Sequence, residues 1–506
     1  MDQNQAPLVE ALAQVESRPP TGFGAPGHGH GSAMPRGLRS LVGSRAFKAD
    51  LLTLKGLDDR VESKMALVRA QDLAADAWGA DLCRLVTGGS TQSLHTVLAA
   101  VAKAGDTILL PQNAHKALWS YALSAGLDAE PLPVQIDHEF DIETVVAPET
   151  LEGALAAYPH AKAVVIVSPN YYGITSDVAA LSRIAHAHGV PLIIDAAWGG
   201  AFAFSPRLPA DALSLGADAQ VCSIHKTMTA LAQGSVFMAK GGLIDLERLH
   251  LAYELFETTS PSVPILASLD ATRRDHALRG PKIWDEVLDL AEDARARIDA
   301  IEGLRVWGRD RLPQASELDG SHILVDLSGL GVSGYAADDW LYENHHVAPG
   351  LCESRHLLFI IGPGTSSSQI RTLVKALTDL SDEVRSDPSL LPRDADRLPG
   401  AGTLSIDRAM PAADAFFADT EEVAYEEAEG RIAAELIAPS PPAVPRLVPG
   451  QRITAAHRDW LVAHRDAGMF VLDPVDQSMH RIRVVRADSP LLDRPLMFAG
   501  AAPGIG

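Results

Sequence analysis

Short apolar runs alternate with amphipathic stretches up to residue 223, and this alternation restricts the fold more than any other feature of the sequence. The runs that are typical of buried strands lie at 107–110, 163–168, 191–195 and 219–223. The stretches with the spacing of amphipathic helices lie at 62–78, 91–104 and 178–188. Because strands that alternate with helices form βαβ units, the sequence predicts an α/β fold whose central sheet is mostly parallel and flanked by helices.

The pattern changes further along the chain, which at 506 residues is too long for one ordinary domain. A long helix at 282–300, strands at 321–327 and 357–361 and a helix at 367–381 together predict a smaller α/β unit. A stretch rich in Pro, Asp and Gly at 383–402 is typical of a linker. We therefore predict four parts: an N-terminal arm (1–60), a large domain (61–275), a small α/β domain (276–382) and a C-terminal α+β domain (403–506).

Charge and cysteine content exclude several classes of protein. Asp and Glu outnumber Lys and Arg by 65 to 43, a net charge of −22, whereas nucleic-acid-binding proteins usually present a basic face. An acidic surface suits a cationic small-molecule substrate, and it equally serves solubility. Cys83, Cys222 and Cys352 form no disulfide pattern, and His28 and His30 lack a third metal ligand nearby. With no signal peptide or membrane-spanning run, the sequence predicts a cytoplasmic protein without metal, nucleic-acid or membrane binding.

Two charged residues follow predicted strands, at the sheet edge where open α/β folds bind ligands. Asp195 ends the run 191–195, and Lys226 comes just after the run 219–223. Taken singly, Asp195 is equally typical of a turn or helix cap, and Lys226 of a surface charge. Together they match the needs of pyridoxal phosphate (PLP), whose aldehyde bonds to a lysine amine and whose ring nitrogen pairs with a carboxylate. The sequence therefore indicates a PLP site.

A glycine pair before a predicted helix, Gly88-Gly89-Ser90-Thr91, offers a place for the phosphate. Glycine lets the backbone approach a ligand closely, and a helix N-terminus presents unpaired N–H groups to an anion. Ser90 and Thr91 add hydroxyl donors, although such residues are also ordinary N-caps. Ser223 and His225, beside the lysine, are further candidates for the same phosphate.

His115, in the segment Asn113-Ala114-His115-Lys116, follows the strand-like run 107–110. Its imidazole is a candidate to stack on a planar cofactor. The alternative is a partly buried histidine that bonds to a backbone carbonyl, and the spacing leaves both open.

Taken in order, these segments resemble the Orn/Lys/Arg decarboxylase family, PLP enzymes of the aspartate-aminotransferase fold (fold type I). The similar segments are Pro26-Gly27-His28, FKADLLTLKGLDD (47–59), TGGSTQ (87–92), NAHKAL (113–118), SPNYYG (168–173), 193–235, which contains IIDAAWGG and SIHKT, and EGRIAAELIAPSPPAVPRLVPGQRIT (429–454). The segment 193–235 is the strongest match. The order of so many motifs over most of the chain makes the resemblance specific.

The resemblance implies a role for each candidate. Lys226 would carry the cofactor as a Schiff base, Asp195 would pair with the ring nitrogen, and His115 would stack on the ring. Trp198 would line the cofactor pocket, and Lys226 or His225 would return a proton to the substrate. The phosphate would be held by Gly89, Ser90, Thr91, Ser223 and His225.

The resemblance also implies a reaction, α-decarboxylation of lysine, arginine or ornithine to the amine and carbon dioxide, in polyamine biosynthesis and amino acid metabolism, by a homodimer or larger homo-oligomer. An aminotransferase or another PLP lyase of the same fold is the alternative. Arg371 is its candidate for holding a substrate carboxylate, although this residue equally suits a helix surface. A non-catalytic binding protein of the fold is a third reading, against which the intact Lys226 and Asp195 argue.

The sequence departs from the family's pattern at four places. Asn170 stands where threonine is usual, and Ala196 where an acidic residue is common. Ala443-Val444 replaces Gly-Ile, and Gln451 replaces the glutamate of a PGE motif. The last two bear on substrate entry, so the identity of the basic amino acid stays open. The turn 362–366 is typical of an ordinary Gly-Pro turn followed by a helix cap, and a position near the dimer interface or the mouth of the site is the alternative.

Overall fold

The computed structural model describes residues 1–17, 19, 21, 23–52, 65–472 and 474–493. Part of the segment 47–59 and the start of the predicted helix 62–78 lie outside the described residues. The chain forms two compact units, each assembled from separate stretches of sequence. The first contains residues 1–101, 178–286 and 362–364, and the second contains residues 102–177, 287–361 and 365–506.

The strands of the main sheet that belong to the first unit follow the order β1-β9-β8-β7. Their bounds are β1 (Leu82–Val86), β7 (Leu192–Asp195), β8 (Ala219–Ser223) and β9 (Ser235–Ala239). β7 and β8 are parallel, whereas β9 runs antiparallel to both β8 and β1. Every residue of β7, β8 and β9 is buried, as expected for strands covered on both faces.

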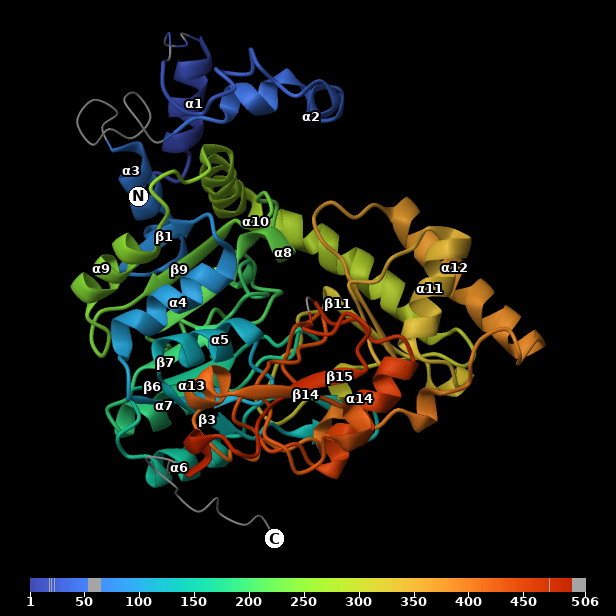
Figure 1. Ribbon diagram of the computed structural model, residues 1–506. Helices are drawn as coiled ribbons and strands as arrows, with labels where there is room; N and C mark the ends of the chain where they lie inside the picture. Colours follow the sequence, from blue (N-terminus) through green and yellow to red (C-terminus); the bar gives the residue numbers. More distant parts are fainter. Residues whose placement is uncertain (18, 20, 22, 53–64, 473, 494–506) are drawn as a thin grey trace. The chain divides into compact units, whose positions relative to one another are not determined.

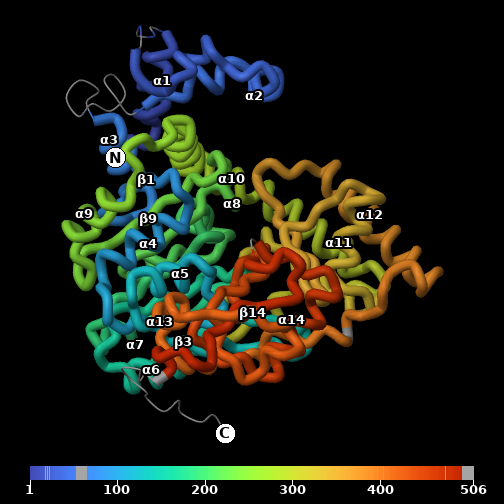
Figure 2. Tube along the Cα trace, viewed as in Figure 1, coloured from blue at the N-terminus to red at the C-terminus, as the bar shows by residue number. Residues whose placement is uncertain are grey.

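Helices precede, separate and follow these strands along the chain, whose course the colours of Figure 2 show. The helices of the first unit are α1 (Pro7–Ser17), α2 (Arg36–Ala49), α3 (Ala66–Trp78), α4 (Gly89–Val101), α7 (Val178–Ala187), η1 (Phe202–Phe204), α8 (Ile224–Thr227), α9 (Leu246–Phe256) and the first part of α10 (Val263–Asp299). The buried face of α3 contains Ala70, Leu73, Ala74 and Trp78, which recur at helical spacing. Burial of one apolar stripe therefore accounts for this helix.

The second unit holds the remaining parallel strands of the main sheet, in the order β6-β2-β3. These strands and the helices between them are β2 (Thr107–Pro111), α5 (Lys116–Ala125), β3 (Asp128–Leu132), α6 (Pro148–Ala157) and β6 (Ala163–Val167), with a short hairpin of β4 (Ile136–Asp137) and β5 (Ile142–Glu143).

A second sheet and a small C-terminal fold complete this unit (Figure 1). The sheet is antiparallel, with the order β10-β11-β13-β12, and the two C-terminal strands pair with each other. The bounds are β10 (Arg305–Val306), η2 (Arg309–Arg311), β11 (His322–Asp326), η3 (Ser328–Leu330), α11 (Gly334–His345), β12 (Leu351–Cys352), β13 (His356–Ile360), α12 (Ser367–Ser386), η4 (Ala395–Arg397), η5 (Ala401–Thr403), α13 (Ala412–Phe417), β14 (Thr420–Ala424), η6 (Tyr425–Glu427), α14 (Ala455–Asp466), β15 (Arg481–Val485) and η7 (Pro490–Asp493). Ile437, Leu447, Trp460 and Ile482 lie in the buried core of the C-terminal fold.

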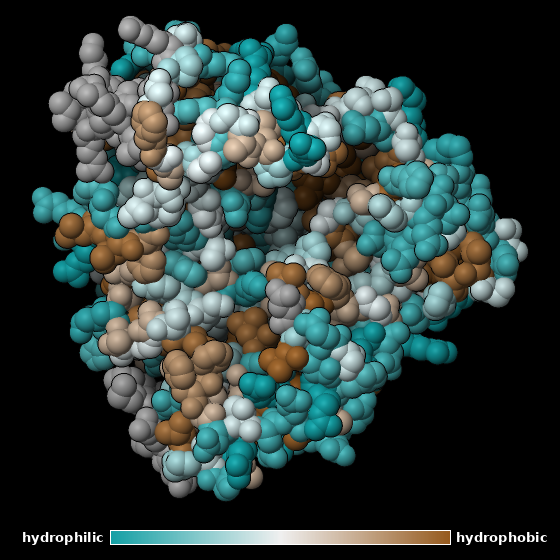
Figure 3. Space-filling view, turned by 45° about the horizontal axis from the view of Figure 1, so that its top comes forward, coloured by the Kyte–Doolittle hydropathy of each residue, from teal (hydrophilic) through white to brown (hydrophobic). Residues whose placement is uncertain are grey.

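The predicted α/β class with a mostly parallel sheet is confirmed, since the four strands predicted up to residue 223 appear as β2, β6, β7 and β8, and the two predicted later appear as β11 and β13. Ser366 caps α12 with a capping box, which confirms the ordinary turn and cap predicted at 362–366. The division into an arm and three domains stays a prediction. The face of the molecule in Figure 3 is largely hydrophilic with separate hydrophobic patches, in keeping with the acidic composition.

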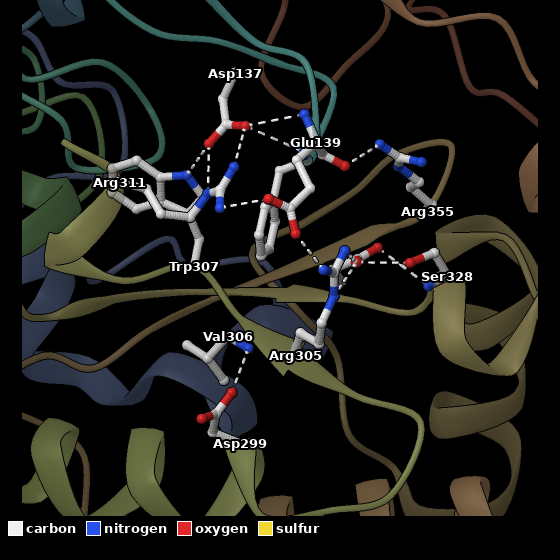
Figure 4. Close-up of polar contacts among 11 residues, drawn as sticks. Asp137, Glu139, Asp299, Arg305, Val306, Trp307, Arg311, Ser328 and Arg355 are labelled. Carbon is white, nitrogen blue, oxygen red and sulfur yellow. Dashed lines mark hydrogen bonds and ion pairs between the residues drawn. The ribbon is translucent and has the colours of Figure 1, made fainter. Parts of the chain in front are cut away.

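An arginine network ties the β4–β5 hairpin to the second sheet within the second unit (Figure 4). Arg311 donates through Nε and Nη2 to Asp137, at 2.7 Å in both cases, and through Nη1 to Glu139 at 2.6 Å. Arg305 bridges Glu139 and Asp326, and both guanidinium groups lie over the ring of Phe140, 4.7 and 4.9 Å from its centre. Although burial opposes it, hydrogen bonds from Arg311 and Trp307 lower the pKa of Asp137 to about 2. The hairpin is therefore held by paired charges.

We expect Arg311→Met to lower the stability of the second unit by about 1–2 kcal/mol, because it leaves the half-buried Asp137 carboxylate with weaker partners. Urea unfolding followed by circular dichroism measures the shift in midpoint. Arg297→Met is the matched control, since the ion pair of Arg297 with Asp293 within α10 is exposed. Equal midpoints for the two variants would show that the network does not hold the hairpin.

Candidate active site

The segment that carries Lys226 is a tight turn of helix, α8, at the end of β8. The carbonyl of Gly234 accepts the N–H of Ile224 at 3.0 Å, and it also accepts from Nδ1 of His225 at 3.0 Å. A Cβ at position 234 would meet the carbonyl oxygen of Leu231 at 2.9 Å, so only glycine allows this approach without a shift. The turn that presents the lysine is thus held by one backbone carbonyl.

Lys226 faces an aromatic ring and a buried carboxylate. Its Nζ lies 4.4 Å from the centre of the Trp198 ring, and the backbone carbonyl of Trp198 accepts a hydrogen bond from Thr227. Burial lowers the pKa of Lys226, while the negative charge of Asp195 acts in the opposite direction. A lysine whose pKa is lowered by burial gives up its proton more readily, as a nucleophilic amine must.

Asp195 ends β7 and is only 3% exposed. Its carboxylate accepts the backbone N–H of Ala197 at 3.2 Å. Burial raises the pKa of Asp195, and the charge of Lys226 opposes this rise. A buried carboxylate is stabilised by a cationic partner, so Asp195 fits the role of partner to a protonated ring nitrogen.

The start of α4 meets the end of β8 through serine hydroxyls. Gly89 opens the helix with a φ of 73°, a conformation that glycine adopts without strain. Ser90 Oγ lies 2.5 Å from Ser223 Oγ, so the structure brings together two of the predicted phosphate residues. Thr91 is exposed in the first turn of the same helix. Hydroxyl donors at a helix N-terminus are what a phosphate group needs, and these residues therefore fit PLP.

Two further serines, which the sequence analysis did not single out, extend this group of hydroxyls. Ser235 Oγ lies 3.3 Å from Ser90 Oγ and 2.9 Å from Ser93 Oγ, and it donates to the carbonyl of Cys222. Ser93 follows Ser90 by one helical turn, so helical spacing from Ser90 could have identified it in the sequence. Ser235 begins β9, a strand that the sequence analysis did not predict, so its position could not be anticipated.

His225 has a defined tautomer. Because the Gly234 carbonyl can only accept, Nδ1 of His225 must carry a proton and donate it. The other ring nitrogen, Nε2, is then the acceptor in the neutral ring. His225 can therefore take up a proton at Nε2 and release it from the same atom.

His115 belongs to the second unit, where it caps α5. Its Nδ1 accepts the backbone N–H of Ala117 at 3.1 Å, so the neutral ring carries its proton on Nε2. The carbonyl-bonded alternative stays open, since a proton on Nε2 can still be donated to an acceptor. Stacking of His115 on the cofactor stays a prediction.

Two departures from the family's pattern have structural roles in the second unit. Asn170 is fully buried, and its side chain bonds to four backbone groups, the carbonyls of Glu143 and Thr144 and the N–H groups of Tyr172 and Ile174. Gln451, 1% exposed, donates to the carbonyl of Ser405 and contacts Nε2 of His457. Both side chains thus tie loops together.

The structure also describes the other residues that the sequence analysis singled out. Ala443 adopts a φ of 62°, which favours the glycine of the family's pattern. Arg371 is exposed on α12. His28 pairs with Asp50 at 3.1 Å, and no group of three or more potential metal ligands occurs among the described residues. Within that part of the chain, no helix is long and apolar enough to cross a membrane.

A glutamate holds both ends of the glycine loop in the first unit. Glu257 accepts hydrogen bonds from Thr87 Oγ1 at 3.4 Å and from Gln92 Nε2 at 2.9 Å. Burial raises the pKa of Glu257 to about 7, against the effect of these two hydrogen bonds. The carboxyl group therefore ionises near neutral pH.

We expect the stability contributed by protonated Glu257 to be present below about pH 4.5 and lost as the pH rises through 7, since its folded pKa lies above the unfolded value. Between pH 5 and 8 the free energy of unfolding of the wild type should fall by about 1–3 kcal/mol relative to that of Glu257→Gln. This range allows for the partial exposure of the Glu257 side chain. Urea midpoints of both proteins across this range measure the difference. Parallel pH profiles would contradict the prediction.

The chain is similar in sequence to known proteins. Residues 6–322 match the sequence model of the Orn/Lys/Arg decarboxylase major domain, and residues 405–468 match that of the C-terminal domain of the same family. The arginine decarboxylase of Bacillus subtilis (strain 168) is 33% identical over 488 residues, which are 96% of this chain and 99% of that protein.

Two solved structures show the fold. The lysine decarboxylase of Francisella novicida has a TM-score of 0.80 at 19% identity, over 95% of this chain and 81% of that one. The ureidoglycine-glyoxylate aminotransferase of Bacillus subtilis has a TM-score of 0.54 at 14% identity, over 69% of this chain and 91% of that one. These likenesses confirm the predicted fold type I, and the sequence matches show that the chain is a decarboxylase of the Orn/Lys/Arg decarboxylase family.

Proposed function

We propose that the chain is a PLP-dependent enzyme that removes the α-carboxylate of a basic amino acid (lysine, arginine or ornithine) and releases the amine and carbon dioxide. The observation that carries this proposal is the juxtaposition of Lys226 with Trp198 and with the charge of the buried Asp195. Membership of the family supports the reaction type. The names of the relatives, arginine and lysine decarboxylases, support a basic substrate.

The residues of the first unit would hold the cofactor. Lys226 would bond to its aldehyde, Asp195 would face its ring nitrogen, and the hydroxyls of Ser90 and Ser223 would bind its phosphate, with Gly89, Thr91 and His225 as further phosphate candidates. When bound, PLP supplies a conjugated ring that accepts the electron pair left behind when a bond to the substrate's α-carbon breaks.

Three side chains would determine where protons lie during the reaction, those of Lys226, Asp195 and His225. Burial favours a neutral amine on Lys226, and the buried negative charge of Asp195 would keep a proton on the ring nitrogen of the bound cofactor. After the carboxylate has left, the α-carbon would take a proton from Nζ of Lys226 or from Nε2 of His225, whichever has first taken up a proton from solvent, since decarboxylation consumes one proton overall. Both atoms remain candidates for this step.

A substrate panel tests the function. The full-length chain, loaded with PLP, is incubated separately with lysine, arginine, ornithine and, as a control, leucine. We expect at least one basic amino acid to yield carbon dioxide and its amine in equal amounts, and leucine to yield neither. Keto acid without carbon dioxide would favour an aminotransferase, and no turnover of any basic amino acid would contradict the proposal.

We further propose that the enzyme acts in the cytoplasm, in polyamine biosynthesis, as a homodimer or larger homo-oligomer. The free state of Cys83, Cys222 and Cys352 supports a reducing compartment. Light scattering after size-exclusion chromatography tests the assembly, for which a monomeric mass would be the contrary result.

A further inference from the structure

The C-terminal fold contacts the segment that carries His115, and both belong to the second unit. The backbone carbonyl of Ala443 accepts the N–H of Lys116 at 2.8 Å. Lys116 follows His115 directly and is the first residue of α5, where a helix leaves its N–H groups without partners of its own. A distant part of the sequence thus fixes the backbone beside a predicted cofactor residue.

The backbone of Ala443 has an unusual conformation at this contact. Its φ of 62° lies in the left-handed region, which is costly for a residue with a Cβ. The N–H of Ala443 donates to the carbonyl of Pro439 at 2.7 Å and closes the turn. Backbone strain of this kind persists only where the surrounding structure determines the conformation, and it is common at functional sites.

A buried ion pair joins the C-terminal fold to the same region three residues further along. Arg446 donates through Nη1 to Glu143, the last residue of β5, at 2.8 Å, and the two side chains are only 8% and 7% exposed. Although burial opposes it, the negative charge of Glu143 raises the pKa of Arg446. Removal of one member of such a pair leaves the other as an uncompensated buried charge, so the attachment is strong.

Two buried asparagines connect the backbone at this ion pair with the His115 segment. Asn170 Nδ2 donates to the carbonyls of Glu143 and Thr144, at 3.3 and 3.0 Å. Asn113 Nδ2 donates to the same carbonyl of Thr144 at 3.3 Å. Asn113, which precedes His115 by two residues, is 3% exposed, so water does not compete for this bond.

The segment 113–116 is therefore fixed on both sides of His115, through Thr144 before it and through Ala443 after it. A side chain that contacts a cofactor has to stay within about 0.5 Å of its productive position, which requires a supported backbone. Both supports depend on the C-terminal fold, one of them directly and the other through the ion pair with Glu143.

We propose that Arg446 and the backbone carbonyl of Ala443 are positioning groups, through which the C-terminal fold sets the place of His115 and hence the affinity of the chain for its cofactor. This role rests on the proposed use of PLP and on the predicted stacking of His115 on the cofactor ring. Neither positioning group has to touch the cofactor itself.

Hydrogen–deuterium exchange followed by mass spectrometry tests the link in the full-length chain, with and without PLP. In Arg446→Met the backbone amides of residues 114–118 should exchange at least about threefold faster than in the wild type, because the segment opens more often. Arg446→Lys, which keeps the charge beside Glu143, should show a smaller increase. If Arg446→Met fails to fold, Arg446→Lys takes its place, with a change in the same direction expected.

Arg408→Met is the matched control. Arg408 also joins the C-terminal fold to the main sheet, but it binds Asp128 and Glu130 of β3 and not the region of Glu143. We expect its replacement to leave the exchange of residues 114–118 unchanged.

The affinity for PLP, measured from the absorbance of the bound cofactor, is the second readout. Arg446→Met should weaken it at least about tenfold, Arg446→Lys less, and Arg408→Met not at all. Unchanged exchange in Arg446→Met, an equal increase in Arg408→Met, or an unchanged affinity for PLP would overturn the positioning role. A wild type that binds PLP and shows the expected exchange but decarboxylates no basic amino acid would contradict the proposed reaction and support the positioning role.

Discussion

Replacing Lys226 by alanine is expected to lower the decarboxylation rate at least about a thousandfold, because the variant loses both the amine that bonds to the cofactor and a candidate proton donor. The rate is measured as carbon dioxide release from the basic amino acid that the panel identifies. Folding should be unchanged, since the charged end of Lys226 is costly to bury and is offset, in the described structure, by the charge of Asp195 and the ring of Trp198.

Lys226→Arg is the matched control for this loss. It keeps a positive charge near Asp195 and Trp198, but a guanidinium group does not act as an amine nucleophile at neutral pH. We therefore expect Lys226→Arg to be as inactive as Lys226→Ala, and ethylamine in solution to restore part of the activity of the alanine variant alone. An active arginine variant would mean that only the charge at position 226 matters.

Asp195→Asn should have the second-largest effect, a fall of about a hundredfold or more in kcat. The amide keeps the shape of the side chain and its bond with the N–H of Ala197, but it removes the charge that stabilises a protonated ring nitrogen. A hundredfold loss corresponds to about 2.7 kcal/mol of transition-state stabilisation. Steady-state kinetics measure it, and Asp195→Glu, which retains the charge, should lose less.

A second readout distinguishes this role from a structural one. The charge of Asp195 raises the pKa of Lys226 against the effect of burial, so Asp195→Asn should lower the pKa of Lys226 further. Cofactor binding to the apo chain should then persist to lower pH than in the wild type. An unchanged pH profile together with unchanged kcat would show that Asp195 does not act at the cofactor.

The sequence predicted those parts of the fold in which burial determines residue type. The runs that became β2, β6, β7 and β8 are almost entirely apolar, because strands inside a sheet lose their polar alternation. β1 and β3 were missed since each carries charged residues, among them Arg84 and Glu130. α10 begins at Val263, well before the predicted start at 282, and contains Pro281, a residue that usually ends a helix.

Sequence patterns predicted the residues of the candidate active site to a similarly limited extent. Lys226, Asp195 and Ser90 could be predicted because each follows a glycine pair or an apolar strand. Ser235 could not be, since its contact with Ser93 depends on the antiparallel strand β9.

Borohydride reduction of the PLP-loaded chain, followed by proteolysis and mass spectrometry, tests the central claim most directly. Reduction makes the bond between a lysine and the cofactor permanent, so the modified peptide identifies the lysine. We predict the modification on Lys226, in the peptide that contains Ser223-Ile224-His225-Lys226-Thr227. A chain without the modification, or one that carries it on another lysine, would contradict the account.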